Sequence, residues 1–358
     1  MSITGSVARD MTIVDGAVGP YERVVWAHDA ASGLQAIVAV HSTVLVPAVG
    51  GCRFYPYPDQ ATAMLDALRL ADGMTFKSAA AGLDLGGGKS VIIGDPRTIK
   101  TPQLLTAFAA VLDVLEGQYY TAEDVGTSTA DMDFLRSLTP YALGVSTELG
   151  GAGDPSPYTA RGVVAAMRAG WEASSGARSL AGARIAIQGA AGKVGAGVAR
   201  LAALEGATLL LSDIDADRLA VVAAETDGTI VGADQVMGAD CDILSPCAMG
   251  GVLNETTVAD LRCRLVCGAA NNQLESDEAS TLLQARGIDY VPDFVANAGG
   301  IIAIAEERDG FDPDHALALA DGIGDAVREI IGEAKADGAS ALSVARRRAA
   351  RRLALAGA

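Results

Sequence analysis

Two lysines stand twelve positions apart in the stretch TFKSAAAGLDLGGGKSV, residues 75–91, and they are the first candidates for chemistry in this sequence. The chain carries 27 lysines and arginines, of which only five are lysines. Lysine can act as a base where arginine cannot, because burial or a nearby cation can lower the pKa of its amine toward neutrality. Lys77 and Lys89 are therefore candidate site residues, although two ordinary surface charges would give the same pattern.

A candidate carboxylate for proton transfer occurs in TAEDVGTSTADMD, residues 121–133. Asp124 follows a predicted strand at QYY, and catalytic residues concentrate in the loops that follow strands. A buried carboxylate beside lysines could move protons. The three histidines are far apart, and the five cysteines form no C-x-x-C pair. The sequence therefore predicts no metal site.

The segment GGGKS suggests a different function, nucleotide hydrolysis. It resembles the end of the phosphate-binding loop G-x-x-x-x-G-K-[ST]. The position of the first glycine in that pattern holds Leu83, and Gly82 is one place off. The segment SVIIGDP after the lysine has a strand pattern, where such a loop requires a helix. This function is therefore disfavoured, and the three glycines before Lys89 predict a close backbone approach and an unusual turn.

A dinucleotide-binding turn is predicted in IAIQGAAGKVGAGVA, between a strand pattern and a helix pattern. Gly189, Gly192 and Gly195 give G-x-x-G-x-x-G, which has one residue more than the usual G-x-G-x-x-G. With Lys193 and Val194, the turn would hold a pyrophosphate at the helix N-terminus.

An acidic residue follows at the end of the next strand, where Asp213 stands in ATLLLSDID. Its carboxylate could accept hydrogen bonds from the ribose hydroxyls and would repel a 2′-phosphate, which favours NAD over NADP. The alternative is that Asp213 only caps the helix beginning at Ala216, a role that Asp215 could fill equally well.

The elements that would position these residues suggest two domains, because 358 residues exceed the usual size of a single core. ERVVWAHD and LQAIVAVHS are predicted as neighbouring strands, and TPQLLTAFAAVLDVLEG as a helix opened by Thr-Pro. The glycine- and proline-rich segment 150–157 predicts a hinge. We expect an α/β fold with an N-terminal domain over 1–150, a Rossmann-type domain with a parallel sheet over 151–324, and C-terminal helices at about 325–358 that pack back on the first domain.

The overall charge and the cysteines indicate which partners and which cellular compartment the protein has. A net charge of −17 argues against nucleic acid, whose binding depends on neutralising phosphates. No apolar run is long enough to span a bilayer, and the N-terminus lacks the order of a signal peptide. Unpaired cysteines suit a reducing compartment. A cytoplasmic protein is expected.

Seven stretches together resemble the NAD-dependent amino acid dehydrogenases that act on leucine, valine and phenylalanine, relatives of glutamate dehydrogenase, with the closest motif likeness to valine dehydrogenases. They occur in family order between about residues 20 and 340: PAVGGCR (47–53), GMTFKSAAAGLDLGGGKSVIIGDP (73–96), TAEDVGTSTADMD (121–133), GGAGDPSPYTARGV (150–163), SPCAMGG (245–251), GAANNQL (268–274) and PDFVANAGG (292–300). The resemblance implies reversible oxidative deamination, in which an L-amino acid, NAD and water give a 2-oxo acid, ammonium and NADH.

The resemblance also implies roles in the chemistry. Lys77 would hold the substrate α-carboxylate, Lys89 would activate the water that attacks the imine carbon, and Asp124 would exchange protons with the amino group and the water. Gly50 and Gly51 would line the substrate site, where a side chain would obstruct the amino acid.

Further residues would bind the cofactor by the same resemblance. Asn271 and Asn297 would contact the nicotinamide ribose or carboxamide, with Asn271 also near the substrate. Ala269 and Thr159 would lie close to the nicotinamide as well. The longer glycine turn departs from the family pattern and leaves the pyrophosphate contacts open, and Cys52, where threonine is common, is expected to pack in the core.

The resemblance places Val49, Ala122, Val295 and Ile301 around the substrate side chain. These aliphatic residues favour valine, leucine or isoleucine, with phenylalanine as the alternative substrate. A dinucleotide-binding regulator without catalysis is the alternative of another class, and the two lysines with Asp124 argue against it. A homo-oligomer, dimer or larger, is expected from the family.

Overall fold

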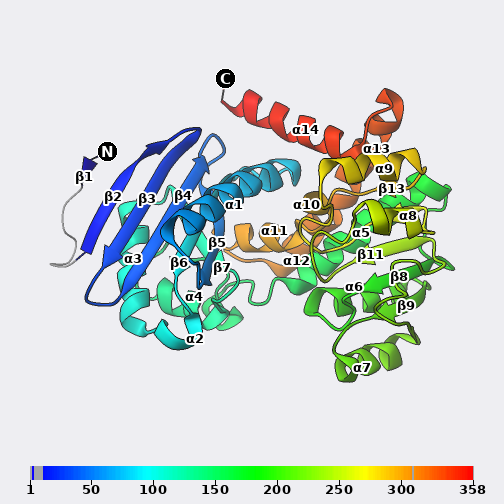
Figure 1. Cartoon of the computed structure of the whole chain (residues 1–358), viewed down its shortest axis with the longest axis horizontal. Helices are drawn as coiled ribbons and strands as arrows, with labels where there is room; N and C mark the ends of the chain where they lie inside the picture. The colour runs from blue at the N-terminus through cyan, green and yellow to red at the C-terminus, as the bar shows by residue number, and fades with distance from the viewer. Residues whose placement is uncertain (1, 4–10, 309, 358) are drawn as a thin grey trace. The chain divides into compact units, whose positions relative to one another are not determined.

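The computed structural model describes residues 2–3, 11–308 and 310–357, and the chain divides into two compact units (Figure 1). The N-terminal unit comprises Met1–Asp154, Ile304–Phe311 and Ala349–Ala358, and the second unit comprises Pro155–Ala303 and Asp312–Arg348. The boundary after Asp154 lies inside the predicted hinge segment. The C-terminal segment differs from the expectation, because residues 312–348 belong to the second unit and only two short pieces return to the first.

The N-terminal unit contains one mixed sheet of seven strands in the order β1-β2-β3-β4-β6-β5-β7. The strands β1 to β4 and β6 pair antiparallel, whereas β5 is parallel to both of its neighbours, β6 and β7. ERVVWAHD and LQAIVAVHS form neighbouring strands as predicted. The strand bounds are β1 (Ser2–Ile3), β2 (Met11–Val18), β3 (Tyr21–Asp29), β4 (Leu34–Ser42), β5 (Ala48–Tyr55), β6 (Gly86–Ile93) and β7 (Tyr119–Glu123).

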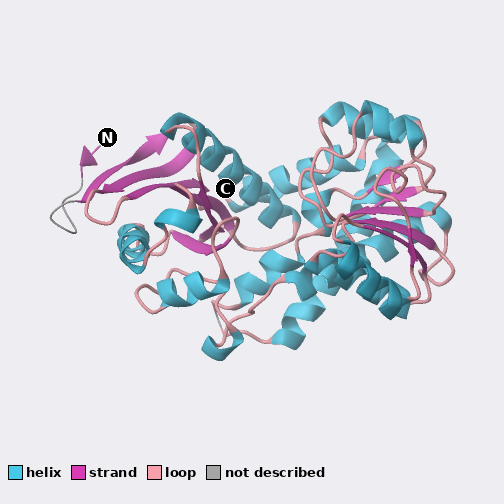
Figure 2. Ribbon diagram, turned by 60° about the horizontal axis from the view of Figure 1, so that its bottom comes forward, coloured by secondary structure: helices cyan, strands magenta, loops and turns pink. Residues whose placement is uncertain are grey.

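Helices cover both faces of this sheet (Figure 2). The helix α1 (Gln60–Ala80) packs alanines spaced four residues apart against one face, which includes Val91 of β6. The helices α3 (Pro102–Val114) and α4 (Thr129–Arg136) pack on the opposite face, and a single turn, α2 (Pro96–Ile99), precedes them. The predicted Thr-Pro start of α3 is confirmed, since Thr101 Oγ1 accepts a hydrogen bond from Leu104 N.

The three glycines before Lys89 lie inside β6, so the prediction of an unusual turn there was wrong. The expected close backbone approach is confirmed. A Cβ atom on Gly86 would lie 1.9 Å from Ser42 O, and one on Gly87 would lie 2.0 Å from Thr75 N on α1. These glycines let α1 and β4 approach the strand that carries Lys89. The strand also excludes the nucleotide-hydrolysing loop, which needs a helix after its lysine.

The second unit contains a parallel sheet of six strands in the order β10-β9-β8-β11-β12-β13. The strand order reverses at β8, and ligands of such sheets bind at the carboxyl ends of the strands near that point. The predicted α/β fold is confirmed. The strand bounds are β8 (Arg184–Gln188), β9 (Thr208–Ser212), β10 (Thr229–Ile230), β11 (Ile243–Pro246), β12 (Leu265–Val266) and β13 (Asp289–Tyr290).

Helices connect these strands and fill the C-terminal part of the chain. The bounds are α5 (Ser156–Ser175), α6 (Lys193–Leu204), α7 (Ala216–Thr226), α8 (Glu255–Asp260), α9 (Asp277–Ala285), α10 (Asp293–Ala296), α11 (Gly299–Glu306), α12 (Pro313–Asp321), α13 (Ile323–Asp337) and α14 (Ala341–Ala356), with a 3-10 turn at Thr147–Leu149. The end of α14 packs in the N-terminal unit, where Ala349 and Leu353 contact Leu45 and Ala79. None of the helices in the described residues is long and apolar enough to cross a membrane.

A buried carboxylate holds the last loop of the N-terminal unit. Glu307 is 7% exposed, and its two oxygens accept hydrogen bonds from Ala152 N at 2.7 Å and Gly144 N at 2.8 Å. Burial raises the pKa of Glu307, while these N–H groups oppose the rise. Sequence reasoning missed this residue, because its partners lie more than 150 positions away.

Glu307→Gln is expected to lower the free energy of unfolding by about 1–3 kcal/mol, because the new amide group would turn an N–H toward a backbone N–H. Denaturant unfolding of the purified variant measures the loss. The matched control is Glu148→Gln, since Glu148 is exposed in the same loop. Equal midpoints for both variants would contradict the role given to Glu307.

Candidate active site

The register of three strands brings the predicted catalytic residues to one face of the N-terminal sheet. Cys52 of β5 pairs with Ser90 of β6, and Gly51 of β5 pairs with Ala122 of β7. Because side chains alternate between faces along a strand, Gly51, Lys89 and Ala122 share a face, and Asp124 continues it beyond the end of β7. This is the face that α1 covers.

Lys89, which is buried, and Asp124, which is partly buried, form an ion pair across the strand β5. Lys89 Nζ donates a hydrogen bond to Asp124 Oδ2. The two residues come from β6 and from the loop after β7, which are separated by β5 in the sheet. The pair can therefore form only where β5 carries no intervening side chain.

Gly51 provides that gap. A Cβ atom at Gly51 would lie 2.7 Å from Asp124 Cβ and 2.9 Å from Asp124 Oδ2. A Cβ atom at Gly50 would lie 1.8 Å from Gly88 O on the neighbouring strand. Both glycines are thus required by the sheet and the ion pair themselves, in addition to any substrate contact implied by the resemblance.

The pKa of Lys89 is lowered to about 7, mainly because burial removes the ammonium from water and secondarily because of the positive charge of Arg53. Lys77 contributes in the same direction. The Asp124 carboxylate favours the ammonium form by direct contact. The balance between burial and this contact decides which of the two groups holds the proton near neutral pH, so the pair is suited to proton transfer.

The loop after β7 fixes the Asp124 carboxylate. Val125 N donates to Asp124 Oδ1 at 2.5 Å, and Asp124 N donates to Thr127 Oγ1 at 2.9 Å. Thr127 Oγ1 in turn donates to Cys52 O at 2.9 Å, which ties the loop to β5. The side chain of Cys52 packs in the core on the opposite face, as expected.

Lys77 lies near the end of α1, the helix on the same face as the ion pair. It is half-buried, and its charge reaches Lys89 strongly enough to help lower the pKa of that amine. The structure therefore brings together three of the predicted residues, namely Lys77, Lys89 and Asp124.

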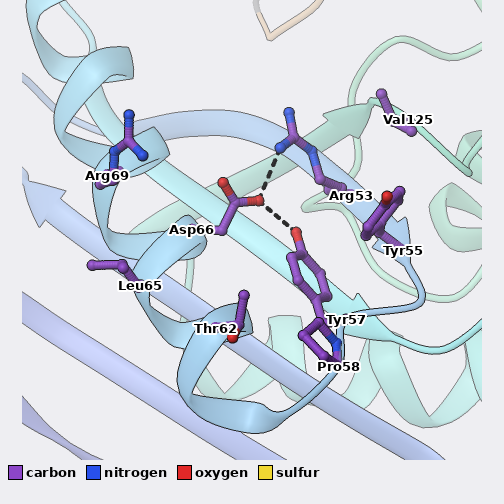
Figure 3. Close-up of a pocket in the computed structure, with 9 residues that line it drawn as sticks. All are labelled: Arg53, Tyr55, Tyr57, Pro58, Thr62, Leu65, Asp66, Arg69 and Val125. Atoms are coloured by element: carbon purple, nitrogen blue, oxygen red, sulfur yellow. Dashed lines mark hydrogen bonds and ion pairs between the residues drawn. The ribbon is translucent and has the colours of Figure 1, made fainter.

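Sequence reasoning missed Arg53, which stands two positions after Gly51 on the same face. It borders a cavity of about 500 Å³ in the N-terminal unit (Figure 3). The lining residues are Arg53, Tyr55, Tyr57, Pro58, Thr62, Leu65, Asp66, Arg69 and Val125. Alternation along β5 would have placed Arg53 beside the pair, had the neighbouring strands been known.

The four residues predicted around the substrate side chain are all buried, but they belong to different units. Val49 lies on β5 and Ala122 on β7, whereas Val295 lies on α10 and Ile301 on α11. None of them lines the cavity beside Arg53. Their common pocket stays a prediction.

The predicted glycine turn in the second unit is a tightly packed turn between β8 and α6. Gly189 has a φ of 81°, and a Cβ atom there would lie 2.8 Å from Ala248 Cβ. A Cβ atom at Gly195 would lie 2.1 Å from Gly189 O. The helix α6 begins after Gly192 without a side-chain cap, and Lys193 and Val194 are its first residues. Its first backbone N–H groups fit a pyrophosphate.

Asp213 lies directly after β9 and against this turn. Its Oδ2 atom accepts a hydrogen bond from Ala191 N at 2.9 Å, and its Oδ1 atom accepts one from Asp215 N at 3.0 Å. The capping alternative for Asp213 was wrong, because Asp215 caps α7 by accepting from Arg218 N at 3.1 Å. Its carboxylate therefore holds the backbone of the turn, and its contact with a cofactor stays a prediction.

Three more of the predicted cofactor residues lie together at the carboxyl side of the same sheet. Asn297 Nδ2 donates to Ala269 O at 3.0 Å and to Asn271 Oδ1 at 2.8 Å. The Asn297 Oδ1 atom is buried and has no hydrogen-bond partner among the residues that the structure describes. Such an orphaned acceptor suits a donor from a bound ligand, for example a carboxamide N–H.

Thr159, near the start of α5, is half-buried, and its hydroxyl donates to Pro155 O at 3.1 Å. Within the described part of the chain, no group of three or more His, Cys, Asp or Glu side chains could hold a metal ion. The five cysteines are unpaired.

Comparison with known families and proteins identifies the family of this chain. Residues 22–141 match the family described as Glu/Leu/Phe/Val dehydrogenase, dimerisation domain, and residues 210–309 match Glutamate/Leucine/Phenylalanine/Valine dehydrogenase. The leucine dehydrogenase of Bacillus subtilis (strain 168) is 42% identical over 333 residues, covering 93% of this chain and 91% of the relative. The valine dehydrogenase of Streptomyces coelicolor is 44% identical over 346 residues, covering 96% and 95%.

A solved structure is also similar over nearly the whole length. The L-tryptophan dehydrogenase from Nostoc punctiforme aligns with a TM-score of 0.83 and 36% identity, covering 93% of this chain and 97% of that chain. Enzymes of this family use a nicotinamide dinucleotide, NAD or NADP. The chain belongs to the glutamate/leucine/phenylalanine/valine dehydrogenase family and is an amino acid dehydrogenase, an oxidoreductase that acts on the CH–NH2 group of its donor.

Proposed function

We propose that this enzyme catalyses the reversible, NAD-dependent oxidative deamination of a branched-chain L-amino acid. The observation that carries the proposal is the Lys89–Asp124 ion pair, with Lys77 on the helix that covers the same face. An L-amino acid, NAD⁺ and water give a 2-oxo acid, ammonium, NADH and a proton.

Each residue has one task in this mechanism. The Lys77 ammonium binds the α-carboxylate and orients the amino acid. The Lys89 amine, free near neutral pH because of its lowered pKa, accepts a proton from the water that attacks the imine carbon. Asp124 passes that proton to the amino group, which leaves as ammonia and takes up a further proton to give ammonium. The bound nicotinamide supplies the acceptor for the hydride from the α-carbon.

The preference for NAD rests on Asp213. Its carboxylate lies against the glycine turn, where it can accept hydrogen bonds from ribose hydroxyls and repel a 2′-phosphate. Gly192, Lys193, Asn297 and Thr159 would bind the remainder of the cofactor.

Asp213→Ala is expected to raise KM for NAD about ten- to hundredfold, because one or two charge-assisted hydrogen bonds to the ribose are lost, with a smaller effect on kcat. Steady-state kinetics with varied NAD measures it. Asp215→Ala serves as the control, since it removes the cap of α7 and the ion pair with Arg218 and should leave KM for NAD near the wild-type value. An unchanged KM in the Asp213 variant removes this residue from the cofactor site.

The aliphatic residues Val49, Ala122, Val295 and Ile301 support a valine-, leucine- or isoleucine-sized substrate. An aromatic substrate is the second candidate, favoured by the likeness to the tryptophan dehydrogenase of Nostoc punctiforme. NADH absorbance with purified enzyme, NAD and a panel of L-amino acids at alkaline pH decides between them. The proposal expects the highest kcat/KM with a branched-chain substrate, and a higher value with phenylalanine or tryptophan would overturn that choice.

We further propose that the enzyme is cytoplasmic and forms a homo-oligomer. It is supported by the match of residues 22–141 to a dimerisation domain and by five unpaired cysteines, which suit a reducing compartment. Light scattering on the purified protein should give a multiple of 36.3 kDa, and a monomer mass would contradict the oligomer.

A further inference from the structure

Arg53 connects the catalytic pair to a second polar group on α1. Its Nη1 atom donates to Asp66 Oδ2 at 2.8 Å, and Tyr57 Oη donates to the same oxygen at 2.6 Å (Figure 3). Its Nε atom lies 3.7 Å from Asp124 Oδ1. That nitrogen is buried and makes no hydrogen bond within the part of the chain that the structure describes. Asp66 thus satisfies one side of the guanidinium, while the Nε–H group near the catalytic carboxylate stays without a hydrogen bond in the described part of the chain.

We propose that Arg53, held by Asp66 and Tyr57, is a positioning residue that sets the proton balance of the Lys89–Asp124 pair. The inference rests on the proposed function of that pair in proton transfer.

The charge of Arg53 acts on both members of the pair in the same sense. A nearby guanidinium disfavours the ammonium form of Lys89 and favours the carboxylate form of Asp124. Both effects remove a proton from the pair and leave it able to accept one from water. Arginine is suited to this task because its guanidinium stays charged throughout the working pH range.

Two side chains of α1, Lys77 and Asp66, also act on Lys89 through their charges. The thiol of Cys52 lies on the opposite face of β5, and burial raises its pKa to about 12, so it stays neutral. Asp66 opposes Arg53, because its negative charge favours the ammonium form of Lys89 and neutralises part of the guanidinium charge. Neutralising Arg53 should therefore raise the pKa of Lys89, and neutralising Asp66 should lower it.

The test is the pH profile of kcat/KM for Arg53→Gln and Asp66→Asn, with folding checked by thermal unfolding. In the wild type, kcat/KM should rise through a limb near pH 7 as Lys89 loses its proton. Arg53→Gln should move this limb toward higher pH by about one pH unit, with about tenfold less activity below the limb and recovery above it. Arg53→Lys should retain most of the wild-type limb. Asp66→Asn should move the limb toward lower pH.

Arg69→Gln is the matched control. Arg69 lines the same cavity, but it forms no ion pair or hydrogen bond among the described residues. Its variant should keep the wild-type profile. A proportional loss at every pH in Arg53→Gln, or an equal shift in Arg69→Gln, would overturn the inference. Where Arg53→Gln fails to fold, the opposite shift of Asp66→Asn carries the test, and an unmoved limb there also overturns it.

Lys89→Arg, measured in parallel, separates this inference from the proposed function. If Lys89→Arg is inactive but the limb does not move in the Arg53 and Asp66 variants, only the role of Arg53 is rejected. An active Lys89→Arg rejects the catalytic role of the pair and the role of Arg53 with it.

Discussion

Lys89→Arg is expected to fold and to lose between about a hundredfold and ten-thousandfold of kcat, because general-base catalysis is lost. A guanidinium cannot give up its proton at working pH, so it cannot accept one from the attacking water. Burial lowers the pKa of the Lys89 amine to about 7, which arginine cannot reproduce. Steady-state turnover with the preferred amino acid, together with circular dichroism, measures both parts of the expectation.

Two further variants make this result interpretable. Lys89→Met retains the aliphatic stem and removes the amine, so it should be as inactive as Lys89→Arg without adding volume. Lys335→Arg is the control for a lysine outside the pair, because Lys335 lies in the second unit and bonds Ala173 O at 2.6 Å. Turnover within tenfold of wild type in Lys89→Arg would contradict the role of the neutral amine.

Gly51→Ala is expected to lower kcat at least about a hundredfold, which is the scale of a misplacement of about 1 Å at a reacting group. The new Cβ atom would lie 2.7 Å from Asp124 Cβ, closer than such atoms approach, so Asp124 must move away from Lys89. The added methyl group would also lie 3.0 Å from Glu123 O of β7, so the strand that leads to Asp124 is pressed as well.

The control for this variant is Gly73→Ala on the exposed side of α1. A Cβ atom at Gly73 meets nothing within 4 Å, and alanine favours the helix, so activity and stability should be retained or improved. The kinetic comparison of the two variants isolates the effect of the ion pair. Wild-type kcat in Gly51→Ala would show that the pair does not need the gap in β5.

Local patterns predicted much of the fold. The Thr-Pro before α3, the β-branched run after Lys89 and the glycine turn after β8 each indicated an element that the structure contains. These signals are local, since each depends on propensities and caps within a few residues. The same applies to Asp124, whose place after a strand follows from the segment around it.

The pairing of strands that are far apart in the sequence could not be predicted from a single sequence. The strand order β6-β5-β7 decides that Gly51 stands between Lys89 and Asp124 and that Arg53 lies beside them. That order depends on the packing of segments that are tens of residues apart. For the same reason the glycines before Lys89 were assigned to a turn, and the return of Glu307 to the N-terminal unit was missed.

The most direct test of the account is the titration of Lys89 itself by NMR. Carbon-13 labelling of lysine Cε gives at most five signals, because the chain has only five lysines, and the signal missing from Lys89→Met identifies Lys89. Because burial lowers the pKa of the Lys89 amine to about 7, this signal is expected to titrate near pH 7. A Lys89 signal that titrates above pH ~10, near the ordinary lysine value, would contradict the account.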